Sequence, residues 1–332
     1  MLKVGIIGIG TMGQFHSNAY SKIAGVKLSG YADPRLDEAQ QLAELYHAKA
    51  TSDVNELIND PEIDIIDICT PTPFHKELTI KAAKAGKHVF CEKPIARTIP
   101  DAMAMIDAVK SAKVKFMVGQ VLRFFPEFAT AKQLIDQGKI GKPGVIRLSR
   151  LSYFPQGVND WMADVDKSGG AILETIIHDF DWLNWCCGEP KRVFARGLVY
   201  DQVYHQNRLD YALVIIRYKS GVIAHVEGSW AQPRGYFSAK LEATGTKGQI
   251  EFSMEDSVAV RVAVKKEQKD IAKVKVPESP LVEDPYTAEI RHFVECVRDD
   301  KEPAVTAVDA VAALKVCLAA LESIKTGQPV NL

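Results

Sequence analysis

The chain has 332 residues, of which 47% are hydrophobic and 25% charged, and its net charge is −1 at pH 7. This length is enough for one large core or two smaller ones, and we expect two. The near-neutral charge disfavours nucleic-acid binding, which depends on neutralising phosphates. No apolar run reaches the roughly 20 residues that span a bilayer, and no charged leader opens the sequence. We therefore expect a cytoplasmic protein that binds neither nucleic acid nor membrane.

The first motif is a glycine-rich turn near the N-terminus. Residues 4–9 form an apolar run typical of a buried strand, and a helix is predicted from Thr11 onward. Glycines at this junction allow a tight turn, approach of a pyrophosphate and close packing of the helix. The helix N-terminus also favours phosphate groups. The alternative is an apolar hairpin with incidental glycines. We expect a dinucleotide to bind here, at Gly8, Ile9, Gly10, Thr11, Met12 and Gly13.

An acidic residue follows the second predicted strand. Val26–Ala32 is expected to be a strand, and Asp33 comes directly after it. In dinucleotide-binding sheets an acid at this place binds the adenine-ribose diol, which favours NAD. Arg35 could instead meet a 2′-phosphate, so the sequence leaves NADP open.

Strands and helices alternate up to about residue 120. Strands are predicted at 26–32, 63–70, 88–91 and 114–119, with helices at 36–46, 53–59, 74–85 and 100–112. This alternation predicts a doubly wound parallel sheet, and so an α/β Rossmann domain over residues 1–120. Ligands of such sheets bind at the carboxyl ends of the strands. The segments expected there are Gly8–Gly13, Thr70–Pro73 and Cys91–Pro94.

The pattern changes in the second part of the chain. Helices are predicted at 128–137 and 171–186, a strand at 144–154, and several β-rich runs between 193 and 276. Tight turns between these runs predict an open, largely antiparallel mixed sheet covered by helices on one face. Helices at 286–298 and 307–326 follow. We expect an α+β domain over 121–332, with the alternative that its C-terminal helices pack back on the first domain.

The six cysteines show no spacing typical of zinc ligands. Cys69 and Cys91 lie at the ends of strand-like runs, and the other four lie in helical patterns. We therefore expect buried, reduced thiols and no metal site.

Cys91-Glu92-Lys93-Pro94 is the first segment that could carry chemistry. A lysine at the carboxyl end of a strand, beside a bound nicotinamide, could stabilise charge on a substrate oxygen. The alternative is an exposed turn with a surface ion pair worth ~0–1 kcal/mol. The spacing alone favours the alternative.

The second such segment runs from Ser168 to Asp181. On one continuous helix, Glu174, His178 and Asp181 would share one stripe. The carboxylate could orient the imidazole, which could then pass a proton during hydride transfer. The alternative is an amphipathic helix whose histidine has only structural partners, and this segment by itself gives both interpretations equal weight.

Taken in order, these motifs resemble the Gfo/Idh/MocA oxidoreductase family. The motifs are the glycine-rich turn, Thr70-Pro71-x-x-x-His75, Glu92-Lys93-Pro94 and Gly169-Gly170…Glu174…His178…Asp181. The resemblance extends through residues 241–250 to the closing Gly327-Gln-Pro-Val-Asn-Leu. It therefore covers essentially the whole chain. The segment around His178 looks most like inositol 2-dehydrogenases.

The resemblance implies roles for particular residues. Lys93 matches the family's active-site lysine, and His178 matches its general acid/base, with Glu174 beside it where the family has Asp. Asp33 matches the acid that selects NAD. The resemblance also implies a homodimer or homotetramer formed through the second-domain sheet. The implied cofactor-binding residues further along the chain are Thr70, Pro71, Thr72, His75, Glu92 and Lys93, with Pro73 in the same segment.

Further substrate contacts are expected from residue type and position. Aromatic rings suit the C–H face of a sugar, and polar groups suit its hydroxyls. An alternative for Trp161 is that it caps the core of the second domain. His16 could face the cofactor, or be a polar surface residue. The expected substrate-binding residues are Lys93, Arg123, Tyr153, Asn159, Trp161, Glu174, His178 and Tyr286, with Asp164 and Asp181 as weaker candidates.

These features predict an NAD-dependent dehydrogenase. It would transfer a hydride between nicotinamide and a secondary alcohol or ketone of a polyol, cyclitol or sugar. Two alternatives are a non-catalytic NAD(P)-binding sensor and an NAD-dependent, redox-neutral glycosidase of the same family.

Overall fold

The computed structural model describes residues 1–155, 158–198, 209–254, 260–264 and 283–332; for 158–160 and 260–264 it describes the backbone alone. The strand-like run expected at 272–276 lies outside these residues. The chain forms two compact units. The first comprises Met1–Phe124 and Glu283–Val311, and the second Phe125–Val282 and Ala312–Leu332. The division at residues 120 and 121 stays a prediction.

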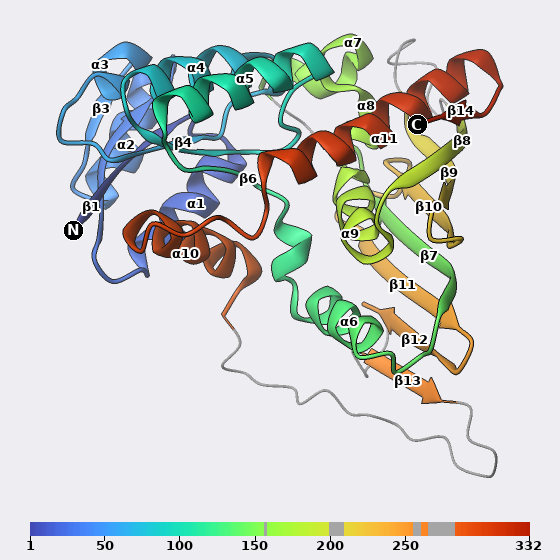
Figure 1. Ribbon diagram of the computed structural model, residues 1–332. Helices are drawn as coiled ribbons and strands as arrows, with labels where there is room; N and C mark the ends of the chain where they lie inside the picture. Colours follow the sequence, from blue (N-terminus) through green and yellow to red (C-terminus); the bar gives the residue numbers. More distant parts are fainter. Residues whose placement is uncertain (156–157, 199–208, 255–259, 265–282) are drawn as a thin grey trace. The chain divides into compact units, whose positions relative to one another are not determined.

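The first unit is built on a parallel six-stranded sheet (Figure 1). Its strand order is β3-β2-β1-β4-β5-β6, and every pairing between neighbours is parallel. This is the order of doubly wound dinucleotide-binding sheets, so the predicted Rossmann fold is confirmed. The strands are β1 (Leu2–Ile7), β2 (Val26–Ala32), β3 (Lys49–Thr51), β4 (Ile65–Ile68), β5 (His88–Cys91) and β6 (Phe116–Val118).

Helices cover both faces of this sheet (Figure 1). α4 (His75–Lys84) and α5 (Ile99–Ala112) pack side by side on one face, while α1 (Thr11–Ser21) and α10 (Pro285–Arg298) lie on the other. Two further helices, α2 (Leu36–Leu45) and α3 (Val54–Ile58), complete the alternation of strands and helices.

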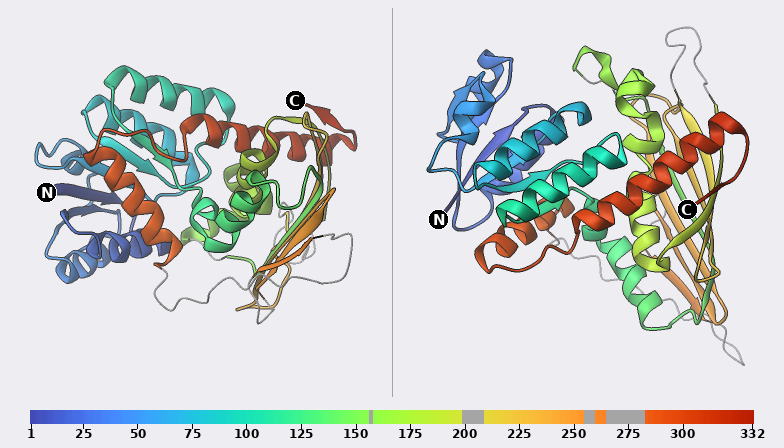
Figure 2. Two further views of the ribbon diagram at one scale, coloured as in Figure 1. Left: turned by 60° about the horizontal axis from the view of Figure 1, so that its bottom comes forward. Right: turned by 45° about the horizontal axis from the view of Figure 1, so that its top comes forward.

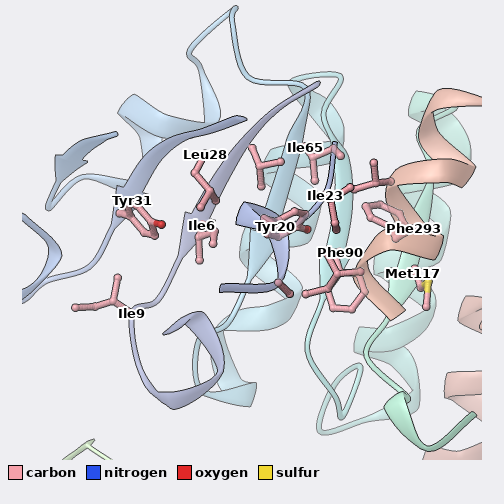
Figure 3. Packing of buried hydrophobic residues seen from close by; sticks show 14 of the residues in the cluster. Ile6, Ile9, Tyr20, Ile23, Leu28, Tyr31, Ile65, Phe90, Met117 and Phe293 are labelled. Atoms are coloured by element: carbon pink, nitrogen blue, oxygen red, sulfur yellow. The ribbon is translucent and has the colours of Figure 1, made fainter. Parts of the chain in front are cut away.

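The core beneath α1 and α10 joins segments from both ends of the chain. Figure 3 shows Tyr20 of α1 and Ile23, which follows this helix, near Phe90 of β5, with Phe293 of α10 beside them. The ring centroids of Phe90 and Phe293 are 5.5 Å apart. The last third of the sequence therefore supplies part of the core of the nucleotide-binding unit.

The second unit contains an eight-stranded mixed sheet. Its order is β13-β12-β11-β7-β10-β9-β8-β14. The pairing of β7 with β10 is parallel, and the other described pairings are antiparallel. The expected mixed, largely antiparallel sheet is confirmed. Its strands are β7 (Pro143–Ser152), β8 (Pro190–Leu198), β9 (Tyr211–Tyr218), β10 (Ile223–Ser229), β11 (Phe237–Gly245), β12 (Gly248–Ser253), β13 (Val260–Val264) and β14 (Val330–Asn331).

Helices lie on one face of this sheet (Figure 2). The ring of Phe128 on α6 packs edge-on against Trp182 of α9 and Phe252 of β12. The backbone N–H of Ala195 on β8 donates to the Ser323 hydroxyl of α11 at 2.9 Å. The helices of this face are α6 (Pro126–Asp136), α8 (Gly170–Glu174), α9 (Ile177–Cys187) and the part of α11 (Ala307–Thr326) beyond Val311.

The expected helix over 171–186 was wrong in one respect, because it is broken. Thr175 and Ile176 separate α8 from α9, and Thr175 has φ −119°. The Thr175 hydroxyl accepts a hydrogen bond from Trp230 Nε1 at 2.6 Å, a contact across 55 positions of sequence. Glu174, His178 and Asp181 therefore do not lie on one continuous helical stripe.

Several short elements were not predicted. They are β3, β14, the four-residue helix α7 (Val165–Ser168), and 3₁₀ segments at Thr72–Phe74, Val121–Phe124 and Val158–Ala163. Among the described residues, no helix combines the length and apolarity needed to cross a bilayer.

Candidate active site

The turn between β1 and α1 requires glycine at two positions. Gly8 has φ +93°, and a Cβ on it would lie 2.7 Å from the Cys69 carbonyl oxygen. A Cβ on Gly13 would lie 2.1 Å from the Gly8 carbonyl oxygen, so larger residues would separate helix from strand. A Cβ on Gly10, by contrast, would meet nothing within 4 Å, and α1 begins there without a side-chain cap. This open helix N-terminus fits a dinucleotide pyrophosphate.

Asp33 lies at the end of β2, paired with Arg35. Its carboxylate accepts hydrogen bonds from the Ile9 backbone N–H at 3.0 Å and from the Arg35 backbone and guanidinium at 2.9 to 3.1 Å. Burial would raise the pKa of Asp33, but the bonds from Arg35 and Ile9 outweigh it and lower that pKa. Arg35 also pairs with Glu38 at 2.8 Å. The two residues expected to discriminate NAD from NADP thus form one ionised pair.

His75 joins the segments that follow β4 and β5. Its ring is 1% exposed. Nδ1 lies 2.9 Å from the Pro94 carbonyl oxygen, and Nε2 lies 2.9 Å from the Thr70 carbonyl oxygen. The structure therefore brings together the predicted Thr70-Pro71-Thr72 and Glu92-Lys93-Pro94 segments, with His75 buried between their backbones.

Glu92 is turned inward beside half-buried Lys93. Its Oε2 accepts the Lys93 backbone N–H at 3.0 Å, and its Oε1 lies 3.1 Å from His16 Nε2. His16 is fully buried, so the surface alternative for it was wrong. Its Nδ1 lies 2.8 Å from Asp67 Oδ2. Among the described residues, His16, Asp67 and Cys69 form the one group of ligand-type side chains close enough to share a metal ion.

In the second unit, Ser168 supports the turn that leads into α8. Its hydroxyl lies 2.9 Å from the Met162 carbonyl oxygen and accepts the Gly170 backbone N–H at 2.9 Å. Gly169 and Gly170 have φ of 81° and 63°, conformations that favour glycine. Ser168 is thus buried and binds backbone on both sides of this turn.

Glu174 and His178 lie at the break between α8 and α9. Glu174 ends α8 and is 8% exposed, while half-buried His178 lies in the first turn of α9. The next residue, Asp179, is buried and accepts two hydrogen bonds from the Arg150 guanidinium of β7, at 2.8 and 3.0 Å. This ion pair fixes the start of α9 on the sheet. Sequence reasoning missed it, because the partners are 29 positions apart.

The remaining expected substrate contacts are spread over both units. In the first, Arg123 is 7% exposed, donates to the Ala304 carbonyl oxygen at 3.0 Å and lies 3.4 Å from Asp309. The Tyr286 ring lies 5.6 Å from that of Phe15.

In the second unit, Tyr153 is 40% exposed and follows β7. Trp161 is half-buried in the 3₁₀ segment Val158–Ala163, and Asp164 caps α7. Asp181 is fully buried. The Asn159 side chain lies outside what the structure describes.

Two family models match the chain. Residues 2–120 match an oxidoreductase family model described as an NAD-binding Rossmann fold, and residues 128–251 match the GFO/IDH/MocA C-terminal domain. The NAD-binding Rossmann fold inferred from the glycine-rich turn is thereby confirmed.

Relatives match over the full length. The scyllo-inositol 2-dehydrogenase (NAD(+)) of Bacillus subtilis is 33% identical, over 100% of this chain and 96% of its own. The myo-inositol 2-dehydrogenase of Thermotoga maritima is 33% identical, over 100% of this chain and 98% of its own. The structure of a levoglucosan dehydrogenase in complex with NADH and levoglucosan is similar with a TM-score of 0.90 at 27% identity, covering 99% of this chain and 99% of the other. The chain belongs to the GFO/IDH/MocA family of oxidoreductases.

Proposed function

We propose that this protein is an NAD-dependent dehydrogenase that oxidises a secondary alcohol of a cyclitol or sugar. The observation that carries the proposal is the full-length similarity to two inositol dehydrogenases, which covers both units and every motif. The open phosphate turn and the ionised Asp33 support NAD as the cofactor. Arg35 beside Asp33 leaves NADP as a testable second cofactor.

Lys93 and His178 are the proposed catalytic residues. When bound, NAD⁺ supplies the acceptor for the hydride. His178 takes the proton of the reacting hydroxyl, and the Lys93 ammonium stabilises the charge on its oxygen. Glu174 orients the imidazole. Support for Lys93 is its place two residues after β5, with its backbone N–H bound by the Glu92 carboxylate. Support for His178 is its half-buried place on a helix start that the neighbouring ion pair fixes.

The remaining candidate residues fall into two groups, those proposed to contact the substrate and one proposed to hold a neighbouring segment in place. Tyr153, Asn159, Trp161 and Tyr286 supply ring faces and polar groups suited to a polyol. Arg123 has its guanidinium engaged by Ala304 and Asp309, so we propose that it acts by holding the segment that starts α11.

A panel of free cyclitols, sugars and glycosides, each mixed with the protein and NAD⁺, tests the function. We expect NADH absorbance to grow with at least one free cyclitol or sugar. Cleavage of a glycoside without net NADH would indicate the redox-neutral glycosidase instead. Binding of NADH without turnover of any compound would indicate a sensor. Repeating the active reaction with NADP⁺ measures the cofactor preference.

We further propose a homodimer or homotetramer formed through the open face of the eight-stranded sheet. The observation in favour is the apolar surface on that face, where Leu213, Ile215 and Ile223 are 37% to 41% exposed. A cytoplasmic location is proposed because the six cysteines, all among the described residues, form no disulfide.

A further inference from the structure

A buried group of titratable side chains lies beneath the carboxyl ends of β4 and β5. His16 lies on α1 and Asp67 on β4. Cys69 directly follows β4, and Glu92 directly follows β5. His16 and Asp67 are fully buried, and Glu92 is 6% exposed. His16 Nδ1 lies 2.8 Å from Asp67 Oδ2 and 3.2 Å from Cys69 Sγ, while Nε2 lies 3.1 Å from Glu92 Oε1. One imidazole therefore stands between two carboxylates.

The charges in this group agree with that arrangement. Burial alone would lower the pKa of His16, but the Asp67 carboxylate and Cys69 outweigh it and raise that pKa well above 6.5. Burial would raise the pKa of Glu92, but contact with the His16 ring and the charge of Lys93 outweigh it and lower that pKa. The raised pKa of His16 and the lowered pKa of Glu92 favour the charged forms of these two side chains. The Nδ1–Asp67 contact is a hydrogen bond and the Nε2–Glu92 contact has the length of an ion pair, so together they form a charge network.

Glu92 transmits this network to the segment that carries Lys93. Its second carboxylate oxygen accepts the Lys93 backbone N–H at 3.0 Å. The carboxylate also packs against Gly119 after β6, where an added Cβ would lie 3.2 Å from Glu92 Oε1. Glu92 is therefore held by His16 on one side and by bare backbone on the other, with its remaining oxygen directed at Lys93.

We propose that His16 is a positioning residue for the dehydrogenase reaction: it fixes the Glu92 carboxylate, and Glu92 in turn fixes the backbone from which Lys93 reaches the substrate. This inference rests on the proposed function. His16 touches neither substrate nor cofactor in this role. It makes the placement of the Lys93 ammonium depend on α1, the same helix that begins at the phosphate turn. A misplacement of ~1 Å at a reacting group can cost ~10²-fold in rate.

Two substitutions of His16 separate positioning from general packing. The amide nitrogen of glutamine in His16→Gln reaches the place of Nε2 and can donate to Glu92. The shorter side chain of asparagine in His16→Asn brings its amide nitrogen only to the place of Nδ1, toward Asp67. Both remove the imidazolium, so they differ in which neighbour keeps a donor.

We expect His16→Asn to lower kcat by ~10²-fold and His16→Gln by less than ~10-fold, with the Kd of NADH changed less than ~3-fold in both. The kcat of each variant is measured with the substrate found in the panel, and NADH binding by fluorescence. Equal kcat values for the two variants would overturn the inference, and so would a loss confined to NADH binding.

Gly119→Ala tests the same link without removing any charged group. Its φ is not in the left-handed region, so alanine fits the backbone, while the added methyl displaces the Glu92 carboxylate by a few tenths of an ångström. We expect kcat to fall ~3-fold or more with NADH binding unchanged. Unchanged kcat in Gly119→Ala would contradict the inference even if His16→Asn fails to fold.

Lys93→Met, assayed in parallel, distinguishes a failure of the proposed role of Lys93 from a failure of the positioning role of His16. If Lys93→Met keeps wild-type turnover, the proposed role of Lys93 fails. If Lys93→Met is inactive while His16→Asn and Gly119→Ala turn over like wild type, only the positioning role of His16 fails.

Discussion

Lys93 and His178 each lie on backbone that neighbouring residues hold in place. The backbone before and after Lys93 is fixed by Glu92 and by His75, which binds the Pro94 carbonyl oxygen. His178 precedes Asp179, which the Arg150 guanidinium holds in two places. Both side chains are half-buried. Each is therefore presented from fixed backbone with its functional group partly accessible, an arrangement suited to a preorganised catalytic group.

Lys93→Met should lower kcat by ~10²–10³-fold, because it removes the cation proposed to stabilise the substrate oxygen. His178→Ala should lower kcat by ~10²–10⁴-fold through loss of the proton acceptor. Both variants should bind NADH as wild type does, which fluorescence titration measures. Near-wild-type turnover in both would show that the catalytic residues lie elsewhere.

The raised pKa of His16 makes stability depend on pH in a defined direction. Because the folded-state pKa lies above the unfolded value of 6.5, the stabilisation is fully present below pH 6.5 and is lost as pH rises through the folded-state pKa. The unfolding free energy of wild type relative to His16→Gln should therefore shrink as pH rises. Urea unfolding at a series of pH values measures it, and a difference that grows toward alkaline pH would refute the assignment.

Sequence alone could not place His16. Its position in the first helix suggested a surface residue or one that faces the cofactor, whereas its carboxylate partner Asp67 lies 51 positions away. Arg123 is a similar case, because its acceptor at Ala304 is 181 positions distant. Asp33 was placed correctly at the end of β2, since a local strand pattern precedes it, but its pairing with Arg35 was not foreseen. Contacts between residues far apart in the sequence produce no periodic pattern by which they could be recognised.

Among the elements, α9 depends on its anchor to β7. Arg150 and Asp179 are buried, and each gives the other its charge partner. Arg150→Met should lower the free energy of unfolding by about 3–5 kcal/mol, because it leaves a buried carboxylate unpaired. The matched double variant, Arg150→Met with Asp179→Leu, should be markedly more stable than the single one. Denaturant unfolding of both checks this, and equal stability of the two would argue against the ion pair.

The long periodic elements were predictable, and the breaks in them were not. Alternating strands and helices identified the Rossmann sheet, because buried parallel strands are continuous apolar runs. The division into α8 and α9 was missed, since an apolar sequence continues through Thr175 and the Trp230 contact that accompanies the break is distant. β3 and α7 are only three and four residues long, too short for a period to be visible. The relative placement of Glu174 and His178 was therefore not predictable, because these residues lie on either side of the missed break.

At the scale of the whole molecule, the face of the eight-stranded sheet that its helices leave open carries exposed apolar side chains. On β9, Leu213, Ile215 and Arg217 are exposed while Ala212, Val214 and Ile216 between them are buried under the helices. The register of β10 sets His225 opposite Ile215 and Ile223 opposite Arg217, which extends the exposed surface. Apolar side chains grouped on an open sheet are typical of association surfaces.

Ile215→Glu should therefore reduce the molecular mass in solution to that of one chain, because an uncompensated charge would be buried in the interface. Light scattering after gel filtration measures the mass. Leu45→Glu is the matched control, since Leu45 is 74% exposed on α2 in the other unit. A wild type that is already a single chain, or an Ile215→Glu variant of unchanged mass, would contradict the proposed assembly.

The return of α10 to the first unit has a consequence for biosynthesis. Ile290, Phe293 and Val294 belong to the core beneath β5 and β6, yet they emerge from the ribosome after every strand of the mixed sheet except β14. A nascent chain that has reached residue 124 still exposes Phe90 and Met117 on that face. The nucleotide-binding unit therefore completes its core only near the end of translation. A polypeptide stalled before that point would expose an apolar surface that chaperones bind.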